Sequence, residues 1–209
     1  MNRFETAQVV EPRVQPGADH VDILSLGEAV VLVVADGAGN SRRGAEAALA
    51  VVRAVQTATA ERTDLMRPEA WSDLLKQCDR LLASTGQGGE TTAVVACVFE
   101  NRIIGASVGD SELWLIQGAS QHALTEHQRR KPLLGSGEST PVFFDTPWTG
   151  GVLLAGSDGL FKYADGPRIR AAAAGPDLSA AARELAALPR LASGGLPDDV
   201  GLVLCRARH

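Results

Sequence analysis

The sequence has few cysteines and few aromatic residues among its 209 residues. The three cysteines, Cys78, Cys97 and Cys205, are far apart in the chain, and no CxxC spacing occurs. This predicts no disulfides and no thiolate zinc site, and it is typical of small core residues in a reducing compartment. Aromatic residues make up only 4% of the chain, so stacking on nucleic-acid bases or on sugars is not indicated.

The chain also lacks a long apolar run and an excess of positive charge. No run reaches the roughly 18 residues of a membrane-spanning helix, and residues 1–20 lack the apolar segment of a signal peptide. We therefore expect a cytoplasmic protein with no membrane partner. The formal net charge is −5, from 20 basic and 25 acidic residues, which disfavours nucleic acid as the main partner.

Apolar residues make up 45% of the chain, which is enough for one core over residues 1–209. The β-branched run from Ala29 to Ala35 predicts a buried strand, and apolar residues at helical spacing follow it. Later apolar segments are joined by connections too short for crossovers, which predicts an antiparallel meander. Because strands and helices come in groups, the pattern favours an α+β fold. The predicted strands cover residues 29–35, 92–99, 102–108, 112–117, 152–155 and 200–205. The predicted helices begin near Ser41, Pro68 and Asp177 or Ser179. Residues 1–20 are predicted to be either irregular or an edge strand, and residues 121–149 to be irregular apart from a short apolar piece.

Four aspartates stand where predicted strands begin or end: Asp36, Asp110, Asp158 and Asp199. Each has a glycine or a second aspartate beside it, and few basic residues are near them in the sequence. An ionised carboxylate near a core is costly unless it is paired. Carboxylates that converge without cations therefore indicate a hard divalent ion such as Mg²⁺ or Mn²⁺. The alternative for each aspartate is a simple turn, where Asp-Gly is common.

These aspartates belong to motifs that occur in the order typical of a known family. The motifs are Asp36-Gly37-Ala38-Gly39-Asn40, Gly89-Glu90-Thr91-Thr92-Ala93, Gly109-Asp110-Ser111, Ser157-Asp158-Gly159-Leu160 and Asp198-Asp199-Val200. Over about residues 19–206 they resemble the PPM family, the PP2C-type metal-dependent protein serine/threonine phosphatases. The segment between Asp110 and Asp158 is short. The resemblance is therefore to a compact bacterial form that lacks most of the flap, similar to phosphatases of sporulation and stress-response signalling.

The resemblance implies a fold and a metal site. The implied fold is one PP2C-like domain over residues 1–209, with two packed antiparallel β-sheets flanked by α-helices. Two Mn²⁺ or Mg²⁺ ions would be held by Asp36, which bridges them, by the carbonyl of Gly37, and by Asp158 and Asp199. Asp110 would help Asp158 to hold a third ion. Asp36, Asp158 and Asp199 would thus act in catalysis through a metal-activated water.

The resemblance also implies a reaction, the hydrolysis of phosphoserine and phosphothreonine on protein substrates phosphorylated by a Ser/Thr kinase. Two ions flanking a water lower its pKa and neutralise the phosphoryl oxygens. Asp22 falls where the family has an acidic motif, and it is implied to act on that water. Ala38 stands where many members have a histidine, and no arginine directly precedes Asp22. Arg13, Arg42 and Arg43 are each either a phosphate contact or a solvated surface charge.

Two alternatives stay open at this point. The absent histidine and arginine fit a catalytically weak or inactive PP2C-like module that binds a phosphorylated regulatory partner. In addition, Gly105-Ala106-Ser107-Val108-Gly109 matches the GxSxG motif of serine hydrolases. That motif requires a strand, a sharp turn and then a helix, whereas residues 112–116 predict a strand.

Overall fold

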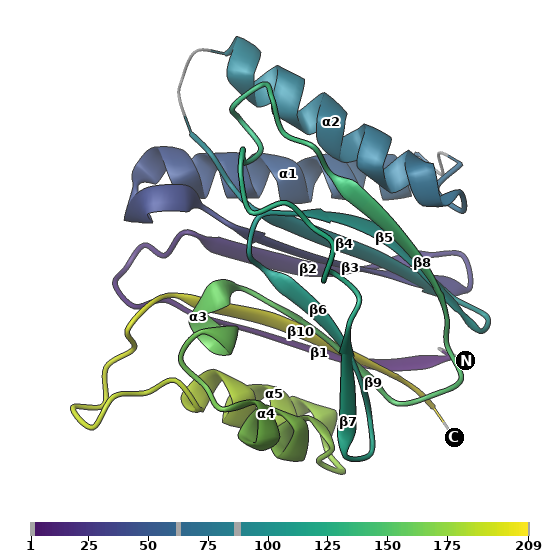
Figure 1. Ribbon diagram of the computed structural model, residues 1–209, viewed down its shortest axis with the longest axis vertical. Coiled ribbons are helices and arrows are strands. Elements are labelled where there is room, and N and C mark those ends of the chain that lie inside the picture. The colour runs from purple at the N-terminus through teal and green to yellow at the C-terminus, as the bar shows by residue number, and fades with distance from the viewer. Residues whose placement is uncertain (1–2, 62–63, 86–88, 209) are drawn as a thin grey trace.

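The chain forms two five-stranded antiparallel sheets that pack face to face, with helices on both outer surfaces (Figure 1). The computed structural model describes residues 3–61, 64–85 and 89–208. The strands are β1 (Phe4–Glu11), β2 (Asp19–Leu26), β3 (Ala29–Asp36), β4 (Ala93–Phe99), β5 (Arg102–Val108), β6 (Glu112–Gln117), β7 (Ser120–Ala123), β8 (Val142–Pro147), β9 (Val152–Gly156) and β10 (Val200–Ala207). The helices are α1 (Arg42–Ala60), α2 (Pro68–Ser84), α3 (Asp158–Phe161), α4 (Gly166–Ala173) and α5 (Leu178–Ala187), and a 3-10 turn covers Ala38–Asn40. The strand order is β1-β10-β9-β6-β7 in one sheet and β2-β3-β4-β5-β8 in the other.

Three apolar layers hold the sheets and helices together. The even-numbered residues Val30, Leu32 and Val34 of β3 pack between the two sheets, whereas the odd-numbered Val31 and Val33 pack under α1 and α2. A third layer lies between the other sheet and α4 and α5. Because both faces of β3 are covered, its sequence is apolar throughout instead of alternating. The uninterrupted run in the sequence therefore corresponds to a central strand of a four-layered fold.

The predicted α+β fold with two packed antiparallel sheets is confirmed. Ser41 caps α1, where its hydroxyl accepts a hydrogen bond from the Gly44 N–H at 3.1 Å. Asp177 caps α5 by accepting from the Ala180 N–H at 3.0 Å. The first residues form an edge strand, β1, which pairs with β10 along its whole length.

The largest differences from the prediction are at the edges of the sheets. Strand β2 was not predicted, and β7 and β8 lie in the part of the chain expected to be irregular. All three are edge strands. Polar residues in these strands make their apolar pattern weak. They are strands because they pair with an apolar neighbouring strand. Helix α4 was also missed, and Asp158 begins α3 instead of standing in a turn.

The three cysteines are free and buried. Burial raises the pKa of the Cys97 and Cys205 thiols to about 12 and that of Cys78 to about 11, so none is a reactive thiolate near neutral pH. Within residues 3–61, 64–85 and 89–208, no helix has the length and apolar character needed to cross a membrane.

Candidate metal centre

Two aspartates face each other at the open end of the β2–β3 hairpin. The turn at residues 27–28 joins the strands so that Asp19 lies directly opposite Asp36. Side chains opposite each other in an antiparallel pair lie on the same face of the sheet. That face is turned toward the second sheet, because Val34, two residues before Asp36, packs in the layer between the sheets. Asp19 is buried at this edge, with 4% of its surface exposed.

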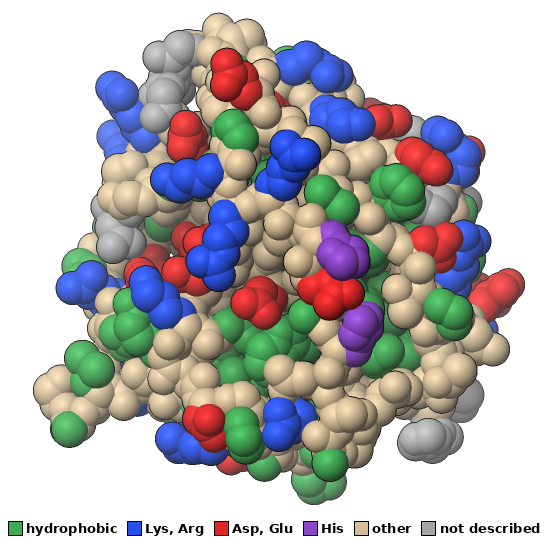
Figure 2. Space-filling model, viewed as in Figure 1, with side chains coloured by type: hydrophobic (Ala, Val, Ile, Leu, Met, Phe, Trp, Pro, Cys, Tyr) green, Lys and Arg blue, Asp and Glu red, His purple; other side chains and the backbone are tan. Residues whose placement is uncertain are grey.

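Further carboxylates reach the same edge from other elements. Asp158 is the first residue of α3, directly after β9, and Asp110 follows β5 at a turn. Gly109 has a φ of +103° in that turn, a left-handed conformation that favours glycine. A Cβ on Gly159 would lie 1.8 Å from the carbonyl oxygen of Asp199, so only glycine lets α3 approach the start of β10 this closely. Figure 2 shows acidic side chains near the middle of one face, with Lys and Arg side chains around them.

Burial and mutual repulsion disfavour the ionised form of Asp19, Asp36 and Asp158. Burial, followed by the charges of Asp19, Asp158 and Asp110, raises the pKa of Asp36 to about 9. Burial also raises the pKa of Asp19 to about 7, and the Asp199 charge adds to it. The pKa of Asp158 is raised by burial and by Asp110. The cluster therefore favours a bound positive charge near Asp36.

The donor atoms of the cluster suit a hard divalent cation. Both oxygens of Asp19 are buried and have no hydrogen-bond partner in the described part of the chain; Ser157 and Asp36 are its near neighbours. Carboxylate oxygens are the ligands that Mg²⁺ and Mn²⁺ prefer. Among the residues that the structure describes, no three Asp, Glu, His or Cys side chains already surround one point closely enough to hold an ion. The carboxylates would therefore have to turn inward to bind it.

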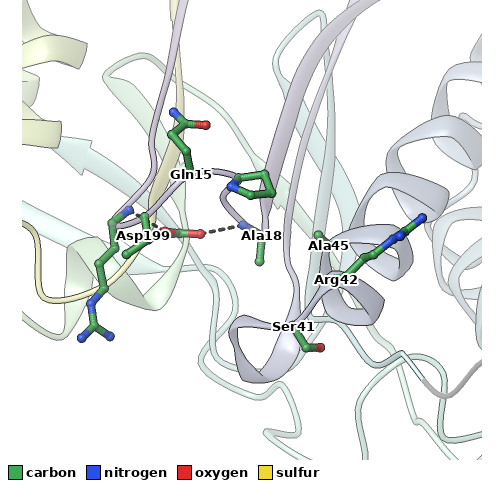
Figure 3. Close-up of a pocket in the computed structure, with 9 residues that line it drawn as sticks. Gln15, Ala18, Ser41, Arg42, Ala45 and Asp199 are labelled. Carbon is green, nitrogen blue, oxygen red and sulfur yellow. Dashed lines mark hydrogen bonds between the residues drawn. The ribbon is translucent and has the colours of Figure 1, made fainter.

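The Asp199 carboxylate is directed toward the loop between β1 and β2 (Figure 3). Its Oδ1 accepts a hydrogen bond from the Arg13 N–H and its Oδ2 accepts one from the Ala18 N–H, both at 2.6 Å. These bonds tie the start of β10 to the loop between β1 and β2. The loop and the start of α1, with Ser41 and Arg42, enclose a cavity of about 420 Å³ that Asp199 also lines. The metal-ligand role implied for Asp199 remains a prediction, which requires these two bonds to open.

The position of Asp22 corrects the expectation that it acts at the catalytic centre. Asp22 lies three residues from Asp19 on β2, and an odd spacing in a strand puts two side chains on opposite faces. Asp22 is opposite Val33, and its Oδ2 accepts a hydrogen bond from Gln56 Nε2 of α1 at 2.7 Å. It therefore faces the helices, whereas Asp19 faces the carboxylate cluster.

Asp19 is the functional candidate that the sequence analysis missed. Its position could have been read from the hairpin, because a two-residue turn at 27–28 places residue 36 opposite residue 19. The sequence analysis named Thr91 and Thr92 only as part of a motif and assigned them no role. Thr91 Oγ1 donates to the carbonyl oxygen of Asp36 at 2.8 Å, and the Asp36 N–H donates to Thr92 Oγ1 at 3.1 Å. These bonds fix the backbone that carries the Asp36 carboxylate.

Behind these threonines, a loop is held by a buried carboxylate of α2. The Asp79 carboxylate accepts hydrogen bonds from the N–H groups of Gly135, Gly137 and Ser139 at 2.7, 2.9 and 2.9 Å. Leu134 in this loop exchanges two backbone hydrogen bonds with Thr91. Asp79 thus holds the loop that pairs with Thr91, the residue that bonds to the backbone of Asp36.

We expect Asp79→Ala to lower the free energy of unfolding by about 2–3 kcal/mol, because three part-buried N–H groups lose a charged acceptor. Burial acts to raise the pKa of Asp79, but the hydrogen bonds from Gly137, Ser139 and Gly135 together outweigh it and hold the pKa below its usual value. The stabilisation is therefore present above the usual pKa and lost as the pH falls through the lowered one. Urea unfolding at neutral and acidic pH measures this difference. The control is Asp73→Ala, which removes an exposed ion pair with Lys76 and should change stability by less than about 0.5 kcal/mol; equal effects of the two variants would contradict the prediction.

The serine-hydrolase alternative is not supported. Ser107 lies within β5 with 1% of its surface exposed, and the next element is strand β6. A nucleophile elbow requires an exposed serine on a sharp turn before a helix. Neither condition holds at this position.

The Stage II sporulation protein E (SpoIIE) family model matches residues 27–208. The chain belongs to the SpoIIE family. No curated protein matches this sequence. The SpoIIE match covers the motifs from Asp36 to Asp199 and confirms the predicted resemblance to sporulation-type phosphatases.

Solved structures of phosphatases share the fold of this SpoIIE-family chain. A bacterial serine phosphatase is 20% identical, with 98% of each chain covered and a TM-score of 0.86. PstP/Ppp from Mycobacterium tuberculosis is 19% identical, with 99% of each chain covered and a TM-score of 0.85. Stp1 from Staphylococcus aureus is 20% identical, with 100% of this chain and 96% of that chain covered and a TM-score of 0.83. These matches confirm the PP2C-like fold, and together with the SpoIIE family they support a protein phosphatase, with no finding that favours the inactive module.

Proposed function

We propose that this chain is a metal-dependent protein phosphatase that hydrolyses phosphoserine and phosphothreonine in protein substrates. The observation that carries the proposal is the carboxylate cluster, in which burial and three neighbouring carboxylates raise the pKa of Asp36 to about 9. The fold supports the same conclusion, because similar structures include serine/threonine phosphatases. A catalytic domain of PstP with a TM-score of 0.85 is described in complex with two manganese ions.

Several residues of this chain would bind or position the metal ions. Asp36 lies at the centre of the cluster and would contact two cations, while Thr91 and Thr92 hold its backbone in place. A Cβ on Gly37 would lie 2.4 Å from the backbone of Gly44, so glycine keeps this segment close to α1. Bound Mn²⁺ or Mg²⁺ would supply Lewis-acid activation of water and charge neutralisation for phosphoryl transfer. The proposed ligands are Asp19, Asp36, the Gly37 carbonyl, Asp110, Asp158 and Asp199.

Asp19 replaces Asp22 in this assignment, since only Asp19 shares the face of Asp36. Ala38 has no acid–base group, so a proton for the leaving serine or threonine oxygen must come from elsewhere. Opposition to a Ser/Thr kinase, a cytoplasmic location and the choice between Mn²⁺ and Mg²⁺ stay predictions from the sequence.

The test is hydrolysis of a phosphothreonine peptide by the purified chain with added Mn²⁺. We expect phosphate release that requires the metal and stops when EDTA removes it. A phosphotyrosine peptide of the same sequence is the matched control and should be hydrolysed much more slowly. Absence of turnover by folded protein at saturating Mn²⁺ or Mg²⁺ would contradict the proposal.

A further inference from the structure

A phosphoryl group that enters a carboxylate-rich site needs cationic side chains to bind its oxygens. The sequence offered Arg13, Arg42 and Arg43 for this role. Arg42 Nε donates to Glu46 Oε1 at 2.8 Å, and the Arg42 side chain is directed along α1 away from Asp199 (Figure 3). The polar contact of Arg13 with the cluster comes from its backbone N–H, which donates to Asp199. None of these contacts places a guanidinium beside Asp158.

The structure brings two other cations to Asp158. Lys162 Nζ lies 3.9 Å from Asp158 Oδ2 and 5.1 Å from the centre of the Tyr163 ring. Arg130 comes from the connection between β7 and β8, and its charge, like that of Lys162, acts to lower the pKa of Asp158 against the stronger effect of burial. Lys162 already has partners, whereas the Arg130 guanidinium makes no hydrogen bond or ion pair with the residues that the structure describes.

The backbone of Arg130 is held beside the cluster by its neighbours. The Gly109 N–H donates to the carbonyl oxygen of Arg129 at 2.9 Å, and Gln128 Nε2 donates to the carbonyl oxygen of Ser111 at 2.8 Å. These bonds fasten residues 128–130 along the turn that carries Asp110. Arg130 and Asp110 also line the same small cavity of about 150 Å³. The segment is therefore fixed, while the Arg130 side chain remains available.

We propose that Arg130 binds the phosphoryl oxygens of the substrate at the Asp110–Asp158 side of the metal centre. The inference rests on the proposed phosphatase function. A guanidinium presents two N–H donors in one plane, which matches the geometry of two phosphoryl oxygens. Arg130 would then supply a phosphate contact in a chain in which no arginine directly precedes Asp22. The short segment that replaces a flap would contribute directly to the site.

The experiment compares Arg130→Ala with Arg129→Ala at saturating Mn²⁺. The two variants lose the same charge from neighbouring exposed positions, but only Arg130 lines the cavity with Asp110. We expect Arg130→Ala to raise both the KM for a phosphothreonine peptide and the inhibition constant of inorganic phosphate by about 10- to 100-fold. Arg129→Ala and Arg13→Ala should change each by less than about threefold. Arg130→Lys should restore part of the loss, because one ammonium cannot form the paired contact.

The half-saturating Mn²⁺ concentration should stay unchanged in Arg130→Ala, which separates phosphate binding from damage to the metal site. The inference would be overturned if Arg130→Ala and Arg129→Ala had equal KM and inhibition constants. It would also be overturned if Arg13→Ala, and not Arg130→Ala, weakened substrate and phosphate binding. In both cases the phosphatase function would stand. Fluorescence anisotropy of a labelled phosphothreonine peptide measures binding independently of turnover. If the wild type binds the peptide without hydrolysing it, the proposed function fails, and weaker binding by Arg130→Ala alone still supports the inference. If the wild type neither binds nor hydrolyses the peptide, both proposals fail.

Discussion

Asp36→Asn is expected to abolish phosphatase activity and at the same time to stabilise the protein in the absence of metal. Loss of the central ligand should lower kcat/KM by at least about 10³-fold, since metal-ion catalysis supplies several kcal/mol. In the metal-free protein the variant removes a carboxylate that burial and three like charges disfavour. We expect the free energy of unfolding to rise by about 2 kcal/mol near pH 8, which corresponds to a Tm increase of roughly 4–8 °C for a chain of this size.

The stabilisation by Asp36→Asn should depend on pH in a defined direction. A carboxyl group whose pKa is raised on folding to about 9 favours the folded state below the unfolded pKa, and this advantage is lost as the pH rises toward 9. The Tm difference between variant and wild type in EDTA should therefore be small near about pH 4 and grow toward about pH 8. Thermal unfolding at several pH values measures it. A variant that is less stable than the wild type at about pH 8 would contradict the described cluster. Added Mn²⁺ should raise the Tm of the wild type more than that of the variant.

The second large effect is a contrast between Asp19→Asn and Asp22→Asn. Asp19 is buried with both oxygens unpaired and faces Asp36, so its variant should lose activity by roughly 100-fold or more and require more Mn²⁺. Asp22 faces α1 and accepts a hydrogen bond from Gln56, so its variant should stay within about threefold of the wild type.

Activity at several Mn²⁺ concentrations measures this contrast, and circular dichroism checks that both variants fold. The pair is well matched, because the two substitutions remove the same charge from the same strand three residues apart. A severe loss in the Asp22 variant together with normal activity in the Asp19 variant would mean that the face assignment of β2 is wrong. The result also decides which aspartate belongs to the family's first acidic motif.

The sequence was informative wherever one segment carried its own signal. The run of residues 29–35 indicated a buried strand, and Ser41 and Asp177 marked the starts of helices, since a capping side chain bonds to the N–H three residues ahead. The edge strands β2, β7 and β8 were not predicted, because polar residues weaken the apolar pattern of their sequences. The two packed sheets were expected only from the resemblance, because they form by pairing between segments that are far apart in the chain.

For the candidate site, the sequence by itself determined the chemistry: aspartates beside glycines at strand ends, in the order of the PPM motifs, with oxygen donors that suit divalent cations. Only the tertiary structure decided which side chains meet. The register of the β2–β3 hairpin brought Asp19, and not Asp22, to the face of Asp36. Contacts between residues far apart in the chain turned Asp199 toward the N–H groups of Arg13 and Ala18 and brought Arg130 beside Asp110. Such positions depend on strand register and on the packing of distant segments, which residue types and spacing do not specify.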